Sequence, residues 1–378
     1  MYNQYLKEVC LQHNIADYVL AGVIHSQLIV AIGQAPEQQP KFPYIFNKLD
    51  EIFVNFDWSQ SFNKPVIIVY DEILYSLCLI EIHNWLRRKS ANLSNIYVVT
   101  SHPINSKRWW NEYCTVMHLE SFVVIDTFFS PKFSDKYLQN LPNLDYDLML
   151  STKLSKIKYL FSYYGGSYGI QERDYLSLQM CEFYNTAMID YVGTFRDKQQ
   201  FLAYVEQISY FMDHQCVSEL DQRYQQFVSE HGKLITHSHW KDYTNQFQQN
   251  ETFSLQGLQW EVDQECMATV IRESKQDECF YQGSEKTWRT FYHCNIAIPM
   301  GYNSVSDLES LGFWFPHDLI DYSYQHEPIF HKRTEKLKHS LRKLSKHTNA
   351  QLKAYVNTNW DNLVHNSKKI NELSERLK

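Results

Sequence analysis

The chain has 378 residues, of which 44% are hydrophobic and 21% charged, and this composition excludes a largely disordered protein. A chain of this length is expected to form two domains with separate cores. Its formal net charge of -7 argues against a protein that binds duplex nucleic acid through a positive field over its whole surface.

The cysteine pattern and the apolar segments predict a cytoplasmic protein. The eight cysteines are scattered, form no Cys-x-x-Cys pair and follow no secretory signal at Met1, as expected of thiols that stay reduced. The most apolar early stretch, residues 18–32, is interrupted by polar residues and is too short to cross a bilayer. We therefore predict a protein without a membrane span, in the cytoplasm.

Residues 1–140 alternate short apolar runs with helical patterns, which is typical of βαβ units around a parallel sheet. The helical pattern at residues 74–88 ends in basic side chains that suit a helix C-terminus. We predict an N-terminal α/β lobe with strands at residues 27–32 (QLIVAI), 65–70 (PVIIVY), 96–100 (IYVVT) and 122–125 (FVVI).

Polar side chains follow three of these predicted strands. Asp71 and Glu72, His102, and Asp126 each come at or soon after the end of a run. Ligands bind outside the carboxyl ends of the strands in open α/β sheets, so this edge is a candidate wall of a binding site. The four side chains are unranked candidates for a general base, and the alternative for Asp71 and Asp126 is that they cap the helices that follow.

Residues 130–150 carry prolines, asparagines and charges without a sustained period, and we place the connection between two lobes there. Asp145 and Asp147 form an Asp-x-Asp pair of the kind that can bind a metal and a diphosphate. Here the pair follows Pro142 and Asn143 rather than a strand, so a solvated turn is the favoured interpretation.

A second lobe is predicted over residues 150–328, and it opens with a strand at 156–164 that leads into a glycine-rich turn and a helix. Gly165 and Gly166 would let the backbone approach a diphosphate, the helix N-terminus would present unpaired N–H groups, and Arg173 would add a bidentate contact. The alternative is a tight connection that needs positive φ angles, because the turn matches neither the dinucleotide fingerprint nor a P-loop.

A second polar segment lies between predicted strands at 268–271 and 296–300. A helix over 284–294 would carry a carboxylate able to accept hydrogen bonds from ribose hydroxyls. It would also carry positively charged side chains able to neutralise a diphosphate. The alternative is an i, i+4 ion pair on a solvated face. The candidate nucleotide-binding residues of this segment are Ser284, Glu285, Lys286, Thr287 and Arg289.

Residues 329–378 form a charged helical extension. We expect it to pack back on both lobes, with its charges in solvent and a basic helix facing nucleic acid as the alternative. The apolar residues that would make this packing are Ile329, Leu337, Leu341 and Leu344.

Four segments of the second lobe resemble the C-terminal motif region of the phage- and virus-encoded glycosyltransferase-like proteins. The first is also distantly similar to the Glu-Lys-x-Trp-Arg motif of α-1,3-fucosyltransferases. The resemblance begins near Lys158, has gaps between its motifs and leaves the first lobe unmatched. The segments are Ser284 to Phe291, Asn295 to Gly301, Leu308 to Phe315 and Asp321 to Tyr324.

The resemblance implies two Rossmann-like lobes that face a cleft, in the GT-B-like arrangement, with an acceptor side in the first lobe and a long C-terminal helical tail. It implies that Glu285 holds the ribose and Lys286 the diphosphate of a nucleotide-diphosphate sugar. The sugar is transferred to a viral glycan or a hydroxylated DNA base, in the host cytoplasm if a virus encodes the chain, and the nucleoside diphosphate leaves. No metal is expected, since positive side chains and a helix dipole can stabilise the leaving diphosphate. A zinc site at His237 and His239 has no matching ligand spacing.

Two other functions stay open on the sequence. A non-catalytic, two-lobed binding or scaffold protein would use the C-terminal helix for partner contacts. A nucleoside-diphosphate-sugar epimerase is disfavoured because the N-terminal region lacks a Gly-x-Gly-x-x-Gly motif.

Overall fold

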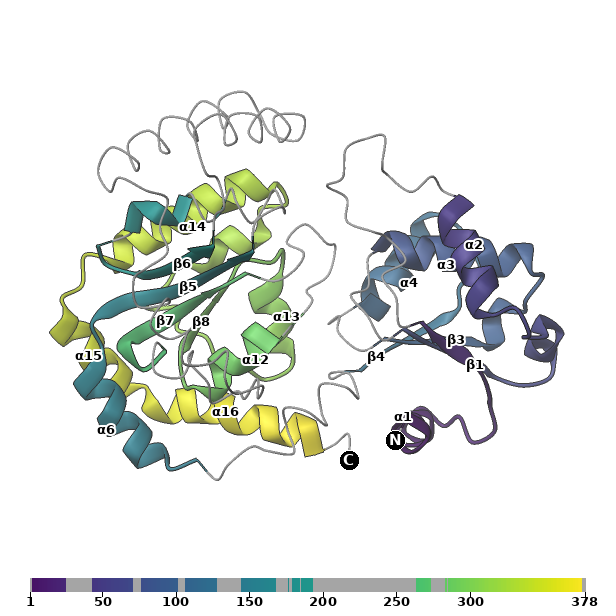
Figure 1. Cartoon of the computed structure of the whole chain (residues 1–378), viewed down its shortest axis with the longest axis horizontal. Helices are drawn as coiled ribbons and strands as arrows, with labels where there is room; N and C mark the ends of the chain where they lie inside the picture. The colour runs from purple at the N-terminus through teal and green to yellow at the C-terminus, as the bar shows by residue number, and fades with distance from the viewer. Residues whose placement is uncertain are drawn as a thin grey trace. The chain divides into compact units, whose positions relative to one another are not determined.

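The computed structural model divides the chain into two compact units (Figure 1). The first comprises Met1–Leu141, Glu278–Ser284 and Asn371–Lys378, and the second comprises Pro142–Asp277 and Glu285–Ile370. Each unit contains one four-stranded parallel sheet with helices, so the α/β class is confirmed for both. The structure describes residues 2–24, 43–70, 76–100, 106–127, 144–167, 176, 179–183, 185–192, 263–272, 283 and 285–375.

The sheet of the first unit has the strand order β1-β2-β3-β4, and all neighbours are parallel. The predictions at 65–70, 96–100 and 122–125 are confirmed to within one residue at the strand ends, and most residues of these strands are buried. The predicted strand at 27–32 lies outside the described residues, and the first described strand precedes it. The four strands are β1 (Val19–Ile24), β2 (Val66–Tyr70), β3 (Ile96–Thr100) and β4 (Val123–Asp126).

The helices between these strands cover one face of the sheet, and the N-terminal helix covers the other (Figure 1). Consecutive right-handed crossovers in one direction place every connecting helix on the same side. One core contains Trp85 of α3 and Trp110 of α4, whereas Leu6 and Val9 of α1 pack in the opposite core. The helices are α1 (Tyr2–Gln12), α2 (Pro43–Ile52), α3 (Ser76–Arg88), α4 (Ser106–Val116) and the 3-10 turns η2 (Trp58–Phe62) and η3 (Leu93–Asn95).

The sheet of the second unit has the strand order β6-β5-β7-β8 and is again parallel throughout. The predicted strands at 156–164, 268–271 and 296–300 are confirmed with shifts of a few residues at their ends. The strand at the β6 edge has no predicted counterpart. The strands are β5 (Tyr159–Ser167), β6 (Met188–Val192), β7 (Cys266–Ile271) and β8 (Ile296–Pro299).

Short helices connect and flank this sheet. The predicted helix at 284–294 is confirmed as α12, which leads from β7 to β8. The helix ends at Tyr292, and Cys294 in the turn that follows has a φ of 52°, in the left-handed region that usually favours glycine. The elements are α6 (Tyr146–Lys156), η5 (Cys181–Phe183), α12 (Glu285–Tyr292), α13 (Ser304–Ser310) and η6 (Tyr322–His326).

The C-terminal region forms α14 (Phe330–Leu344), α15 (Asn349–Thr358) and α16 (Trp360–Glu375), which are three helices rather than one long tail. Thr348 begins α15 with a capping box. Leu337, Leu341 and Leu344 are buried as expected, but Ile329 is 42% exposed. No helix in the described part of the chain is long and apolar enough to cross a bilayer.

Candidate functional site

The strand order of the second sheet creates a switch point between β5 and β7. The chain leaves β5 toward β6 on one side, whereas it leaves β7 through α12 toward β8 on the other. The two connections therefore diverge from adjacent strands. In open parallel sheets the crevice that binds ligands lies outside the carboxyl ends of the strands at such a point. The first sheet, whose described strands follow one another in simple order, has no such reversal among them.

Gly165 and Gly166 lie at the carboxyl end of β5, beside this switch point. Tyr164 pairs with Asp190 and Ser167 with Val192, so three steps along β5 match two steps along β6. This offset is a β-bulge, and it falls on the two glycines. A glycine bulge turns the backbone out of the regular ladder and leaves no side chain in the way of a ligand. Arg173, predicted to act with these glycines, lies outside the described residues.

The N-terminus of α12 lies at the same edge of the sheet. Glu285 is the first residue of the helix, which starts after β7 ends at Ile271. Lys286 is partly exposed, whereas Thr287 is fully buried and Ser284 lies outside the described residues. The parallel pairing of β5 with β7 therefore brings the two predicted segments, at 165–166 and 285–286, to one edge of one sheet.

Arg289 does not share the environment of Lys286. It is 5% exposed, and its Nε lies 3.8 Å from Oδ2 of Asp263, a carboxylate that is itself fully buried. Asp263 precedes the amino end of β7, so this contact directs the guanidinium away from the carboxyl edge. Among the described residues, Lys286 is the positively charged side chain in the first turn of α12.

A buried polar network that the sequence did not indicate lies at the opposite, amino edge of the second sheet. Lys153 Nζ donates to the backbone oxygens of Asp263 at 3.1 Å and Cys266 at 2.9 Å, and to the Asn295 side chain. Nδ1 of His293 lies 2.7 Å from Oδ2 of Asp263. Burial lowers the pKa of Lys153 to about 8, although the Asp263 carboxylate opposes the shift.

This network links helices and strands that are far apart in sequence. Lys153 is on α6, Cys266 begins β7 and Asn295 immediately precedes β8. The Asn295 amide also donates to the Thr269 hydroxyl at 3.0 Å. Because Lys153 lies more than a hundred residues before its partners, no local pattern could have revealed these contacts. The network ties α6 to the amino edge of the sheet, opposite the edge that carries the glycine bulge.

Asp126 is the only one of the four candidate bases whose position is described, because Asp71, Glu72 and His102 lie outside the described residues. Its carboxylate accepts from the Lys107 N–H at 3.0 Å, from the Thr100 hydroxyl at 3.1 Å and from the Ser106 hydroxyl. It thus caps α4, the helix that precedes it in sequence rather than one that follows. Burial raises the pKa of Asp126, and these hydrogen bonds oppose the rise.

The candidate metal residues have other roles or are not described. Asp145 is the N-cap of α6 and accepts from the Leu148 N–H at 3.0 Å. His237 and His239 lie outside the described residues. Within the described ranges, no group of three His, Cys, Asp or Glu side chains is placed to hold a metal ion.

Comparisons with known proteins found no relative of the chain. Neither the protein-family models, nor the curated proteins, nor the solved structures contain a match to the chain. The case for a function therefore rests on the carboxyl edge of the second sheet, with its switch point, its glycine bulge and the start of α12.

Proposed function

We propose that the chain is a glycosyltransferase and that the carboxyl edge of its second sheet binds a nucleotide-diphosphate sugar. The observation that carries the proposal is the switch point between β5 and β7, where Gly165, Gly166 and Lys286 lie on segments of the same sheet edge. Such a switch point is the usual place for a nucleotide in a parallel α/β unit.

The features of this sheet edge match the chemical groups of a nucleotide-diphosphate sugar. The glycine bulge admits a diphosphate close to the backbone, and the start of α12 carries the positive end of a helix dipole. Lys286 adds a full positive charge in the first turn of the helix. The Glu285 carboxylate would accept hydrogen bonds from the ribose hydroxyls. Arg289, paired with buried Asp263, is assigned to holding α12 in place.

The chemistry follows from these charges. An acceptor hydroxyl attacks the anomeric carbon, the bond from that carbon to the diphosphate oxygen breaks, and a general base takes the hydroxyl proton. The leaving nucleoside diphosphate gains negative charge, which Lys286 and the helix N-terminus stabilise, so no metal is needed. We propose a viral glycan or a hydroxylated DNA base as the acceptor.

Binding of the leaving group tests the proposal directly. The melting temperature of the full chain is measured with UDP, GDP, CMP, TDP and ADP, because a ligand that binds only the folded state raises its stability. We expect one nucleotide to raise the melting temperature of the wild type and of Lys156→Ala, and to have little effect on Lys286→Ala. Lys156 is a matched control, since it is exposed at the end of α6 and the change removes the same charge.

Two results would count against the proposal. If no nucleotide shifts the wild type, a non-catalytic binding protein becomes the better interpretation. If a nucleotide binds Lys286→Ala as tightly as the wild type, the diphosphate does not lie at the start of α12.

A further inference from the structure

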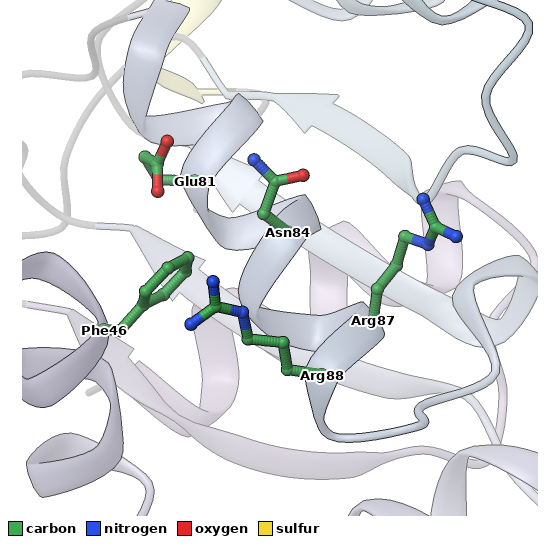
Figure 2. A pocket seen from close by; sticks show the side chains of 5 residues that line it. All are labelled: Phe46, Glu81, Asn84, Arg87 and Arg88. Atoms are coloured by element: carbon green, nitrogen blue, oxygen red, sulfur yellow. The ribbon is translucent and has the colours of Figure 1, made fainter. Parts of the chain in front are cut away.

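A pocket in the helical layer of the first unit has the character of a second ligand site. It encloses about 480 Å³ and is lined by Phe46 of α2 and by Glu81, Asn84, Arg87 and Arg88 of α3 (Figure 2). This volume is within the range of about 300–1,000 Å³ that is typical of small-molecule sites. The spacing of Glu81, Asn84 and Arg88 places them along one face of α3.

Glu81 gives the pocket a buried carboxyl group in need of a partner. The residue is 2% exposed, and among the described residues its Oε2 has no hydrogen-bond partner. Burial raises the pKa of Glu81, while the nearby Arg88 charge opposes that rise. A buried oxygen without a partner is costly, so a ligand that donates a hydrogen bond here recovers free energy.

The two arginines supply positive charge, and Glu81 is the carboxyl group that lines the same pocket. Neither Arg87 nor Arg88 forms an ion pair with another described residue, whereas the next side chain, Lys89, pairs with Asp50 at 2.6 Å. The Arg88 guanidinium lies over the Phe46 ring, with its carbon 4.2 Å from the ring centre. Stacking holds the planar group in place and leaves its edge N–H groups available for an oxyanion.

The arrangement of these groups sets two requirements on a ligand. In Figure 2, Glu81, Phe46, Asn84 and Arg88 surround one space, and Arg87 extends to the side. A ligand must present an anion toward the Arg88 guanidinium and a hydrogen-bond donor toward Glu81. A bare oxyanion meets only the first requirement, and a neutral polyol meets only the second.

We propose that this pocket binds a sugar phosphate, with the phosphate on Arg88 and a hydroxyl group on Glu81. Two oxygens of a phosphate match the paired N–H groups of one guanidinium. The exposed Asn84 amide can donate to a second hydroxyl or accept from it. The site is built from residues of the first unit alone, so it does not depend on the glycosyltransferase proposal.

Titration calorimetry on the full chain tests this site. The ligands are hexose, pentose and triose phosphates, with free glucose, inorganic phosphate and glutamate for comparison. We expect at least one sugar phosphate to bind with a dissociation constant below about 1 mM, and glucose and inorganic phosphate to bind at least about tenfold more weakly. Arg88→Ala and Glu81→Gln should each weaken binding of the sugar phosphate by about tenfold or more.

Matched variants distinguish a loss of binding at this site from an effect on the proposed nucleotide site and from misfolding of the chain. Arg108→Ala removes an exposed arginine of α4 in the same unit and should bind the sugar phosphate like the wild type. Lys286→Ala should keep sugar-phosphate binding, and Arg88→Ala should keep any nucleotide-induced rise in melting temperature. Circular dichroism verifies that each variant is folded.

Several outcomes would overturn the proposal. Failure of every sugar phosphate to bind the wild type at about 10 mM would do so. Equal affinity for inorganic phosphate would show that Glu81 has no role, and tighter binding of glutamate would indicate an amino-acid site. Unchanged affinity in folded Arg88→Ala would place the ligand elsewhere.

Discussion

Replacement of Lys153 by methionine tests the buried network of the second unit. Lys153 is fully buried on α6, and its ammonium group donates to two backbone oxygens and to the Asn295 side chain. Methionine fills a similar volume but donates no hydrogen bond. The change therefore leaves the oxygens of Asp263, Cys266 and Asn295 without this donor, deep in the protein.

The magnitude follows from the cost of buried oxygens that lose their donor. A buried acceptor left without a partner costs about 1–3 kcal/mol, and three are affected here. Part of this is offset because the variant no longer buries a charged amine, a penalty that is visible in the lowered pKa of Lys153. We expect Lys153→Met to lower the free energy of unfolding of the second unit by about 3–5 kcal/mol.

The effect should depend on pH in a defined direction. The pKa of Lys153 is about 8 in the folded chain, against 10.5 for the ordinary side chain. Between these values the unfolded chain binds more protons than the folded one, so this lysine makes stability rise with pH. The variant lacks the rise, and its deficit relative to the wild type should grow between about pH 7.5 and pH 9.5.

Amide hydrogen exchange, read by mass spectrometry on peptides that cover β7, measures the stability of the second unit separately from the first. Lys156→Met is the control, because Lys156 lies on the same helix but is exposed. A Lys153→Met variant as protected as the control would refute the proposed role of the network. A deficit that shrinks as the pH rises would refute the assigned pKa shift.

Two further predictions concern the first unit. Because burial raises the pKa of Asp126, the folded state holds its proton more firmly than the unfolded one, so stability should fall as the pH rises from about 4 toward neutrality. Asp126→Asn should lose this component in urea titrations at several pH values, and an unchanged pH dependence would contradict the shift. Ser90 has a φ of 55° after the end of α3, so Ser90→Gly should raise the free energy of unfolding by about 0.5–1 kcal/mol. A lower urea midpoint would show that its hydroxyl matters more than the strain.

The strands that could be predicted share one property, which is a short apolar run that needs no information about distant residues. Residues 66–70 are buried along their whole length, as expected for a central parallel strand. The strand at Val19–Ile24 was not singled out, since it is only partly buried and contains Gly22 in the middle. A local sequence pattern therefore identifies a fully buried strand more readily than a partly buried one.

The sequence by itself determined the α/β class, most of the central strands and the helix that starts at Glu285, because each depends on periodicity within one segment. Only the tertiary structure decided that β5 lies beside β7, which brings Gly165 and Gly166 to the same sheet edge as Lys286. Only the tertiary structure shows that Arg289 contacts Asp263 and that Glu81 lines a pocket with Phe46 and Arg88. Strand order, charge pairing and cavities join residues that are distant in the chain, and no local pattern encodes them.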